Sequence, residues 1–419
     1  MKVRSIVAGA VFVSASGVFA WGQQQPLKLD ELLAEALRGN PEILAAQKRY
    51  EAARQRPTQE STLPEPMFSL GYQSTGSPRP FAGLGKDPLA NAGFMVSQEF
   101  PFPGKLGLRG GMATKEAEAE FQQYQAVQLN VVSRLKQAYY RLYYAYAASD
   151  ALSRNRDLLK KLLRVTEVRY TVGKAAQQDV FKAQTQVGIL ETRLVKLELE
   201  RNSAEAEINS LLNRAAGTPV PRPEDLKPKD FALNLNELYN SARTESPMLR
   251  REQKMIERTE LALNLARKDY YPDYTLTAGY FNQGSMPPMY MARVDFKLPV
   301  YFWRKQRAGV AEQASNAVQA RRTYEATDQS LRFRIKGDYL MAQASWKLME
   351  LYGNTVVPQA SLALESSLST YETGTVDFLS VLTNFTTVLD YEVNYWEEFA
   401  NYYQALCRLE EMTAQKLTD

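Results

Sequence analysis

The sequence predicts a mainly helical protein that also carries four β-strands. These elements form two copies of one pattern: short helices, two strands, a very long helix and a return helix. Apolar and polar residues alternate ahead of each long segment, and a run of roughly 65 residues ending at Tyr170 has no proline and has apolar residues at helical spacing. A similar arrangement returns about two hundred residues later, which indicates a duplicated half.

Composition excludes several classes of function. The 419 residues are 45% hydrophobic and 23% charged, which is typical of folded proteins. There is no histidine and one cysteine, Cys407, so the commonest general base is missing and no intrachain disulfide can form. The net charge of +4 is too small to indicate a nucleic-acid partner. We therefore expect no enzymatic activity, no cofactor and no metal centre, and we expect Cys407 in the apolar part of a helix.

Residues 1–20 are typical of a secretory signal peptide. Lys2 and Arg4 supply the charged start, residues 6–13 form a short apolar core, and residues 18–20 provide small side chains for cleavage. No cysteine directly follows that site, so we expect an exported chain that is not lipidated at an N-terminal cysteine. No later segment has about 18 consecutive apolar residues, so transmembrane helices are not expected.

In each half, a short amphipathic helix precedes a second helix that starts with proline. Asn40 and Ser246 are the predicted N-caps, because a polar side chain can accept the free amides of a first helical turn. The second helix of the first half is expected to stop before Pro57. The two openings align at a constant offset, which pairs Leu29, Glu31, Leu32, Ala36 and Pro41 with Leu235, Glu237, Leu238, Ala242 and Pro247.

Two strands follow in each half, at about residues 65–76 and 91–100 and at about 273–283 and 289–298. Apolar and polar residues alternate along each of them. A period of two gives a sheet one apolar and one polar face. On its own, this alternation fits a soluble sheet as well as a sheet in a membrane.

Each pair of strands leads into two long helices, predicted at about 104–171 and 176–213 and at about 303–371 and 377–415, with an interruption near residues 353–358. At 1.5 Å per residue, the first helix would be about 100 Å long. Such length is typical of a coiled coil or a helical tube. Four prolines between residues 219 and 228 mark an exposed linker, so the two repeats are assigned to residues 21–222 and 223–419.

The junctions between strands and long helices are rich in proline and aromatic residues. Pro101, Pro103 and Pro299 donate no amide to a sheet, so strand pairing should end there. If the strands enter a bilayer, the aromatic residues would form a belt at its inner surface: Phe100, Phe102, Phe296, Tyr301, Phe302 and Trp303. Four strands cannot close a transmembrane barrel, and lipid tolerates no open strand edge. Several chains would therefore combine, two giving eight strands and three giving twelve.

The order and duplication of these features resemble the TolC-type outer-membrane efflux proteins. The resemblance covers residues 27–415 and is carried by the duplicated openings, by the junction at residues 98–105, and by the turns at residues 169–180 and 371–382. It implies a homotrimer with a twelve-stranded β-barrel in the outer membrane of a Gram-negative bacterium and an α-helical barrel in the periplasm. It also implies a periplasmic adaptor protein and an inner-membrane pump as partners. The junction most resembles the branch that serves heavy-metal pumps of the resistance-nodulation-division class.

The resemblance places a periplasmic tip, which would contact the adaptor, at the two turns between long helices: Tyr170, Thr171, Val172, Gly173, Lys174, Tyr371, Thr373, Gly374, Thr375 and Asp377. The best-studied members of the family carry two aspartates on the return helix beyond the second turn. The matching positions here are Ser380 and Thr383, so an acidic ring of the family kind is not expected. Asp377 is the acid nearest to these positions, and it is equally well explained as the N-cap of the return helix as by a role in such a ring.

Two further clusters have alternative explanations. The adjacent acids at residues 397–398 and 410–411 are expected on a solvated helix face, because neighbouring helix positions do not face one another. Met286, Met289 and Met291 lie between the third and fourth expected strands. Their thioethers suit Cu(I), but a hairpin in which they pack against aromatic side chains also accounts for them.

The sequence therefore predicts an outer-membrane exit duct of a tripartite efflux pump, which passively conducts substrates such as heavy-metal cations or drugs. Two alternatives remain open. One is the exit duct of a type I protein-secretion system, which would use the same fold. The other is a periplasmic coiled-coil structural or adaptor protein with a soluble sheet.

Overall fold

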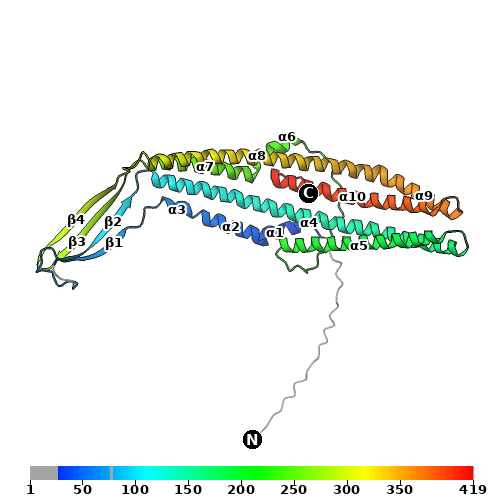
Figure 1. Cartoon of the computed structure of the whole chain (residues 1–419), viewed down its shortest axis with the longest axis horizontal. Coiled ribbons are helices and arrows are strands. Elements are labelled where there is room, and N and C mark those ends of the chain that lie inside the picture. The colour runs from blue at the N-terminus through cyan, green and yellow to red at the C-terminus, as the bar shows by residue number, and fades with distance from the viewer. Residues whose placement is uncertain (1–26, 76–78, 419) are drawn as a thin grey trace, which may run out of the picture.

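The computed structural model describes residues 27–75 and 79–418. The molecule is elongated, with a narrow sheet at one end and helices along the rest of its length (Figure 1). The predicted signal peptide, residues 1–20, lies outside the described residues.

Four antiparallel strands form one sheet in the order β1-β2-β3-β4: Met67–Gln73, Asn91–Phe100, Asp273–Gln283 and Met286–Lys297. The two inner strands, β2 and β3, come from different halves of the chain and pair directly. β1 begins at Met67 rather than near residue 65. Pro64 and Pro66, which have no amide to donate, precede it.

The fourth strand begins at Met286 rather than at residue 289, which corrects the sequence prediction. The methionine-rich segment therefore belongs to β4 and not to a connecting hairpin, and the turn before it contains Gly284 at φ +75°. Pro287 and Pro288 are tolerated within β4 because its pairing with β3 shifts between Phe281 and Gln283, and neither proline has a register partner there.

The long helices run the length of the molecule away from the sheet (Figure 1). Their bounds are Lys105–Thr171 (α4), Gln177–Leu211 (α5), Lys305–Leu351 (α8), Val357–Thr373 (α9) and Phe378–Thr413 (α10). α8 begins two positions after Trp303, because residues 301–304 form turns. The expected interruption is a π-helical turn, Tyr352–Val356 (η1), followed by Pro358, which lacks the amide that a regular α-helix would use. Within the described residues, no helix combines the length and the apolar character that crossing a bilayer requires.

Five further helices of the described residues flank these: Leu29–Gly39 (α1), Pro41–Ala53 (α2), Arg56–Ser61 (α3), Leu235–Glu245 (α6) and Pro247–Lys268 (α7). Asn40 caps α2 as predicted, since its side-chain oxygen accepts the amides of Glu42 and Ile43 at 2.9 and 3.2 Å. Ser246 occupies the predicted N-cap position of α7, but its side chain makes none of the expected capping hydrogen bonds. α3 was not predicted: Pro57 sits in the first turn of a new helix besides following the end of the previous one.

α4 is the central helix and packs against α5, α7 and α10. One core cluster lies midway along the helices, where Tyr139, Ile208 and Phe399 are fully buried. A second cluster continues toward the end far from the sheet, around Leu159 and Phe385. Each half contributes helices to both clusters, so neither half has a hydrophobic core of its own.

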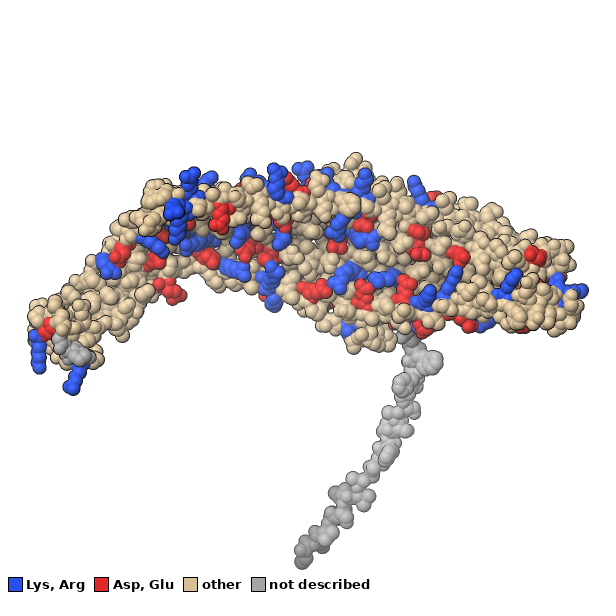
Figure 2. All heavy atoms as spheres, in the orientation of Figure 1, with Lys and Arg blue, Asp and Glu red and all other residues tan. Residues whose placement is uncertain are grey.

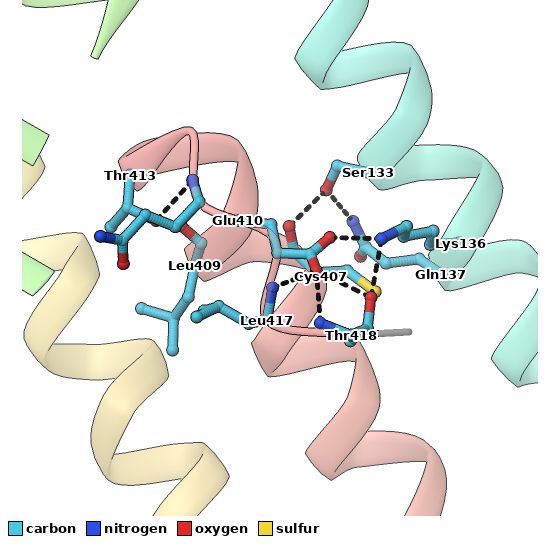
Figure 3. A network of polar contacts seen from close by, with 10 residues as sticks. Ser133, Lys136, Gln137, Cys407, Leu409, Glu410, Thr413, Leu417 and Thr418 are labelled. Atoms are coloured by element: carbon cyan, nitrogen blue, oxygen red, sulfur yellow. Dashed lines mark hydrogen bonds and ion pairs between the residues drawn. The ribbon is translucent and has the colours of Figure 1, made fainter. Parts of the chain in front are cut away.

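A buried ion pair joins the middle of α4 to the last turn of α10. Nζ of Lys136 lies 2.6 Å from Oε2 of Glu410, and both side chains are almost fully buried (Figure 3). Oε1 of Glu410 accepts the amide of Leu417 at 2.7 Å and the hydroxyl of Thr418 at 2.8 Å. The segment after α10 is thus folded back onto the pair. Glu410 therefore does not lie on a solvated face, which corrects the prediction, whereas Cys407 is fully buried as expected.

Candidate functional site

One face of the sheet is almost entirely apolar. Side chains of paired strand residues lie on the same face, so the strand register defines this surface. Apart from Gln98 and Asn282, the apolar face consists of Phe68, Leu70, Tyr72, Ala92, Phe94, Val96, Phe100, Tyr274, Leu276, Ala278, Tyr280, Tyr290, Ala292, Val294 and Phe296. Leu70 is 78% exposed and Tyr290 75% exposed, and no described helix packs across this face.

The opposite face carries hydroxyls, amides and charges. The polar face includes Ser69, Gln73, Ser97, Glu99, Asp273, Thr275, Thr277, Gln283, Arg293, Asp295 and Lys297. The hydroxyls of Ser97 and Thr277 lie 3.1 Å apart across β2 and β3, and Arg293 forms an ion pair with Asp295. In Figure 2, charged side chains gather along the helices and near the two ends of the sheet, and leave the middle of its visible surface uncharged.

These two faces separate the alternatives that the alternation left open. Contiguous apolar surface of this extent is rare on a soluble protein, and the outer edges of β1 and β4 have no described partner strand. Lipid can cover an apolar face, but it cannot satisfy open strand edges. The apolar face therefore fits a membrane environment, and the two open edges are available for pairing with further strands.

The junction between β2 and α4 is fixed by a buried lysine. Nζ of Lys105 lies 2.9 Å from Oδ1 of Asp273 and 3.3 Å from Oδ1 of Asp269, and Lys105 is only 3% exposed. The same oxygen of Asp273 accepts the amide of Phe102 at 2.7 Å. One carboxylate at the start of β3 thus positions the strand end and the helix start of the other half.

The turn before α4 requires glycine. Gly104 adopts φ +88°, a left-handed conformation in which other residues are strained. Nζ of Lys268, at the end of α7, donates to the carbonyl of Pro103 at 3.0 Å and closes the corner from the other side. The junction is evident in the sequence, but the role of Lys105 is not, because its partners are distant in the chain.

The six aromatic residues of the predicted belt all lie where the sheet meets the helices: Phe100, Phe102, Phe296, Tyr301, Phe302 and Trp303. Phe100 stacks on Tyr274 with ring centroids 5.4 Å apart, and Phe102 stacks on Tyr271 at 4.5 Å. The four near the end of β4 are each more than half exposed. The structure thus adds Tyr271 and Tyr274 to this aromatic zone.

The two predicted tip turns lie together at the end of the molecule far from the sheet (Figure 1). The turn at residues 170–174 joins α4 to α5, and the turn at residues 371–377 joins α9 to α10. Gly173 and Gly374 adopt φ +73° and +87°, which explains glycine at both positions. The side chains of Tyr170 and Val172 are exposed there, whereas Tyr371 is buried.

Arg169 ties the two turns together. Its guanidinium group lies over the ring of Tyr371 at 4.5 Å and donates to the backbone carbonyls of Tyr371 and Glu372. The hydroxyl of Tyr371 reaches Thr166 on α4 at 3.4 Å. The contact of Arg169 with the second turn has no signature in the sequence, because its partners lie about two hundred residues later in the chain.

Asp377 acts as the N-cap of α10. Its Oδ1 accepts the amide of Ser380 at 3.3 Å, and it also bonds the hydroxyl of that residue. These hydrogen bonds hold the pKa of Asp377 below its usual value. Ser380 and Thr383 are both exposed, and the hydroxyl of Thr383 donates to the carbonyl of Leu379 within the helix.

Comparison with known proteins identifies the family. The model of the family described as "Outer membrane efflux protein" matches residues 32–214 and 238–415, so the chain belongs to this family. The outer membrane protein TolC of Vibrio cholerae serotype O1 is 23% identical over 376 residues, which cover 84% of this chain and 83% of that relative. These matches confirm the resemblance to TolC-type proteins.

Solved structures agree on the fold. The outer-membrane channel OprN matches with a TM-score of 0.80 at 16% identity, over 99% of this chain and 98% of that one. The outer membrane protein VceC from Vibrio cholerae matches with a TM-score of 0.79 at 18% identity, over 93% of this chain and 97% of that one. The relatives named here are channels or outer membrane proteins rather than enzymes, which fits the prediction of a non-enzymatic role.

Proposed function

We propose that this protein is the outer-membrane exit duct of a tripartite efflux pump. The duct conducts substrates passively, and the pump supplies the energy for transport. The observation that carries the proposal is the sheet, whose uncovered apolar face lies opposite a polar face. In this arrangement lipid covers the apolar face and water in the duct contacts the polar face.

The duct is a homotrimer in this proposal. Each chain supplies four strands, and the open edges of β1 and β4 pair with neighbouring copies. Three chains give a twelve-stranded barrel. The choice of three over two follows from the resemblance to TolC-type proteins.

The junction residues set the orientation. The aromatic zone lies at the inner surface of the outer membrane, and the long helices extend from it into the periplasm. The turns at residues 170–174 and 371–377 then face a periplasmic adaptor and an inner-membrane resistance-nodulation-division pump. The junction sequence at residues 98–105 supports a pump of the heavy-metal branch.

Reconstitution tests this function directly. The protein purified in detergent is expected to have the mass of three chains, to resist unheated sodium dodecyl sulfate, and to form stepwise conducting channels in planar bilayers. A chain that stays monomeric and soluble without detergent would instead support the periplasmic structural or adaptor alternative.

Cell assays separate the two kinds of duct. Deletion of the gene is expected to lower tolerance to metal salts, dyes or antibiotics, and complementation should restore it. A deletion that leaves tolerance unchanged but abolishes export of a protein would favour a type I secretion duct.

A further inference from the structure

Methionines of two strands lie on the polar face of the sheet, on either side of β3. Met95 on β2 and Met291 on β4 are both register partners of Gly279 on β3, so the three residues form one row across the strands. In the neighbouring row, Phe281 on β3 pairs with Met289 on β4. The methionines of β4 are close together in the sequence, whereas Met95 joins them only through the strand register.

The missing side chain of Gly279 opens the space between these groups. A Cβ placed on Gly279 would lie 3.0 Å from Cγ of Met95 and 2.9 Å from Cε2 of Phe281. A Cβ placed on Gly93 would lie 2.7 Å from Cδ1 of the same ring. The ring of Phe281 therefore lies over both glycines, and the side chain of Met95 reaches over Gly279 beside it.

The methionine side chains around the ring of Phe281 differ chemically from the rest of the polar face. Hydroxyl, amide and carboxylate oxygens are hard ligands, whereas thioethers are soft ligands that select Cu(I) and similar ions. The chain has no histidine, and its one cysteine is buried among the helices. Methionine sulfur is therefore the soft ligand that the described polar face offers.

We infer that Met95, Met289 and Met291 form a binding site for soft monovalent cations, Cu(I) or Ag(I), on the duct side of the sheet. The inference rests on the proposed function in that the polar face lines the duct. The face of the Phe281 ring adds a cation–π contact to the sulfur ligands. Such a site would hold the ion during its passage without a redox step.

The ligand chemistry gives the site a distinctive pH response. Thioethers are neutral and carry no proton, so ion binding releases none. Affinity should therefore stay constant between pH 5 and 8, whereas sites built from histidine or cysteine weaken in acid because protons compete for their ligands.

The test uses the full chain in detergent and titrates it with silver nitrate in chloride-free buffer. Silver is the probe because Ag(I) does not change oxidation state under these conditions. We expect one Ag(I) per chain, sulfur scatterers in the X-ray absorption spectrum, and binding weakened about tenfold or more in a Met95→Leu/Met289→Leu/Met291→Leu variant. Leucine keeps the side-chain volume, so the sheet should stay intact.

Met67→Leu is the matched control. Met67 lies on the same face and is 66% exposed, but it pairs with Ser97 and has no second thioether opposite. Its replacement should leave silver binding unchanged. Equal silver affinity in the wild type and the triple variant, or an equal loss with Met67→Leu, would overturn the inference and leave packing against aromatic side chains as the role of these methionines.

Conductance separates this inference from the proposed function. The triple variant should conduct like the wild type in planar bilayers without silver. Channels that form normally while silver affinity is unaffected by the triple substitution would reject the metal site alone. A wild-type protein that forms no channels would reject the duct, and with it the placement of the site along a transport path.

Discussion

Gly104 and Lys105 shape the corner at which the first strand pair meets the helices. Gly104 supplies a left-handed backbone conformation, and Lys105 reaches the carboxylate of Asp273 at the start of β3. Lys105 is followed along α4 by Gly107, whose surroundings are open. Gly104 is therefore required by its backbone conformation, whereas Gly107 lies in the helix with room for a side chain.

Gly104→Ala should destabilise the protein by about 1–2 kcal/mol, because a side chain is strained in the left-handed conformation. The new Cβ would lie 2.9 Å from Nζ of Lys268, the end of a flexible side chain that can move aside. The matched variant Gly107→Ala should raise stability by up to about 1 kcal/mol, because alanine favours the helix. Apparent melting temperatures in detergent measure both, and a shift in the same direction for both would contradict the explanation.

Lys136→Met should be strongly destabilising, because it leaves the buried carboxylate of Glu410 without its cation. Breaking such a pair costs about 3–5 kcal/mol. Hydrogen exchange at the amides of Leu417 and Thr418, which Glu410 accepts, should accelerate as the apparent melting temperature falls. The double variant Lys136→Met/Glu410→Met should recover part of the loss, and no recovery would mean that the pair is not the main contribution.

At the scale of elements, the paired tip turns depend on contacts between helices of different halves. α4 ends beside α9, and Arg169 connects them through two backbone carbonyls and the ring of Tyr371. A hydrogen bond to a charged group contributes about 1.5–3 kcal/mol. The two turns should therefore open together rather than separately.

Arg169→Ala should loosen the turn at residues 371–377 while leaving the sheet unchanged. Amide exchange in that turn is expected to rise by about tenfold or more, which corresponds to one lost charged hydrogen bond. Arg164→Ala is the control, because Arg164 is exposed on the same helix. Equal acceleration in both variants would show that charge, and not the contact with Tyr371, stabilises the turn.

The cap of α10 should depend on pH. Since hydrogen bonds from Ser380 keep the pKa of Asp377 below its usual value near 4, the cap is fully present above that value and is lost as pH falls through the lowered pKa. Asp377→Asn keeps an acceptor at the cap and should remove this dependence. Pepsin cleavage of the turn, compared between about pH 4 and 2, measures it.

The same variant tests whether Asp377 contributes to ion selectivity. Conductance and cation selectivity of Asp377→Asn near pH 7 should be close to those of the wild type, because the carboxylate serves the helix. A large loss of cation selectivity in planar bilayers would show instead that Asp377 faces the permeating ions.

At the scale of the whole molecule, the two faces of the sheet predict opposite responses to charge. Leu70→Arg places a cation on the apolar face, which costs about 2–4 kcal/mol near the middle of a bilayer. Ser69→Arg places the same charge one residue away on the polar face. The amount of heat-modifiable oligomer in outer-membrane fractions should fall with Leu70→Arg and remain with Ser69→Arg, and equal yields would contradict the assignment of the faces.

Local patterns were enough to predict most elements. Alternation located the strands, and apolar spacing with glycine and proline signals located the long helices and the turns at Gly173 and Gly374. The start of β4 was misplaced because Pro287 and Pro288 are typical of a loop, although the register shift in the pairing of β3 with β4 accommodates them. The helix α3 was missed for a related reason, since Pro57 both follows one helix and enters the next.

Contacts between distant segments could not be predicted in the same way. Lys105 and Asp273 are 168 positions apart, and Arg169 and Tyr371 are 202 apart. Neither pair has a local signature, because the register between β2 and β3 and the packing of α4 on its neighbours bring them together. Glu410 was placed in solvent for the same reason: its cation, Lys136, lies on another helix.

The one cysteine of the chain has a practical consequence. Cys407 is fully buried beside the Lys136–Glu410 pair, and burial raises the pKa of its thiol. Maleimide and methanethiosulfonate reagents should therefore not react with it. A cysteine introduced at an exposed tip position such as Val172 would then be the single reactive thiol in an otherwise native sequence. Spin labels or fluorophores attached there could report distances between the subunits of an assembly while the protein conducts.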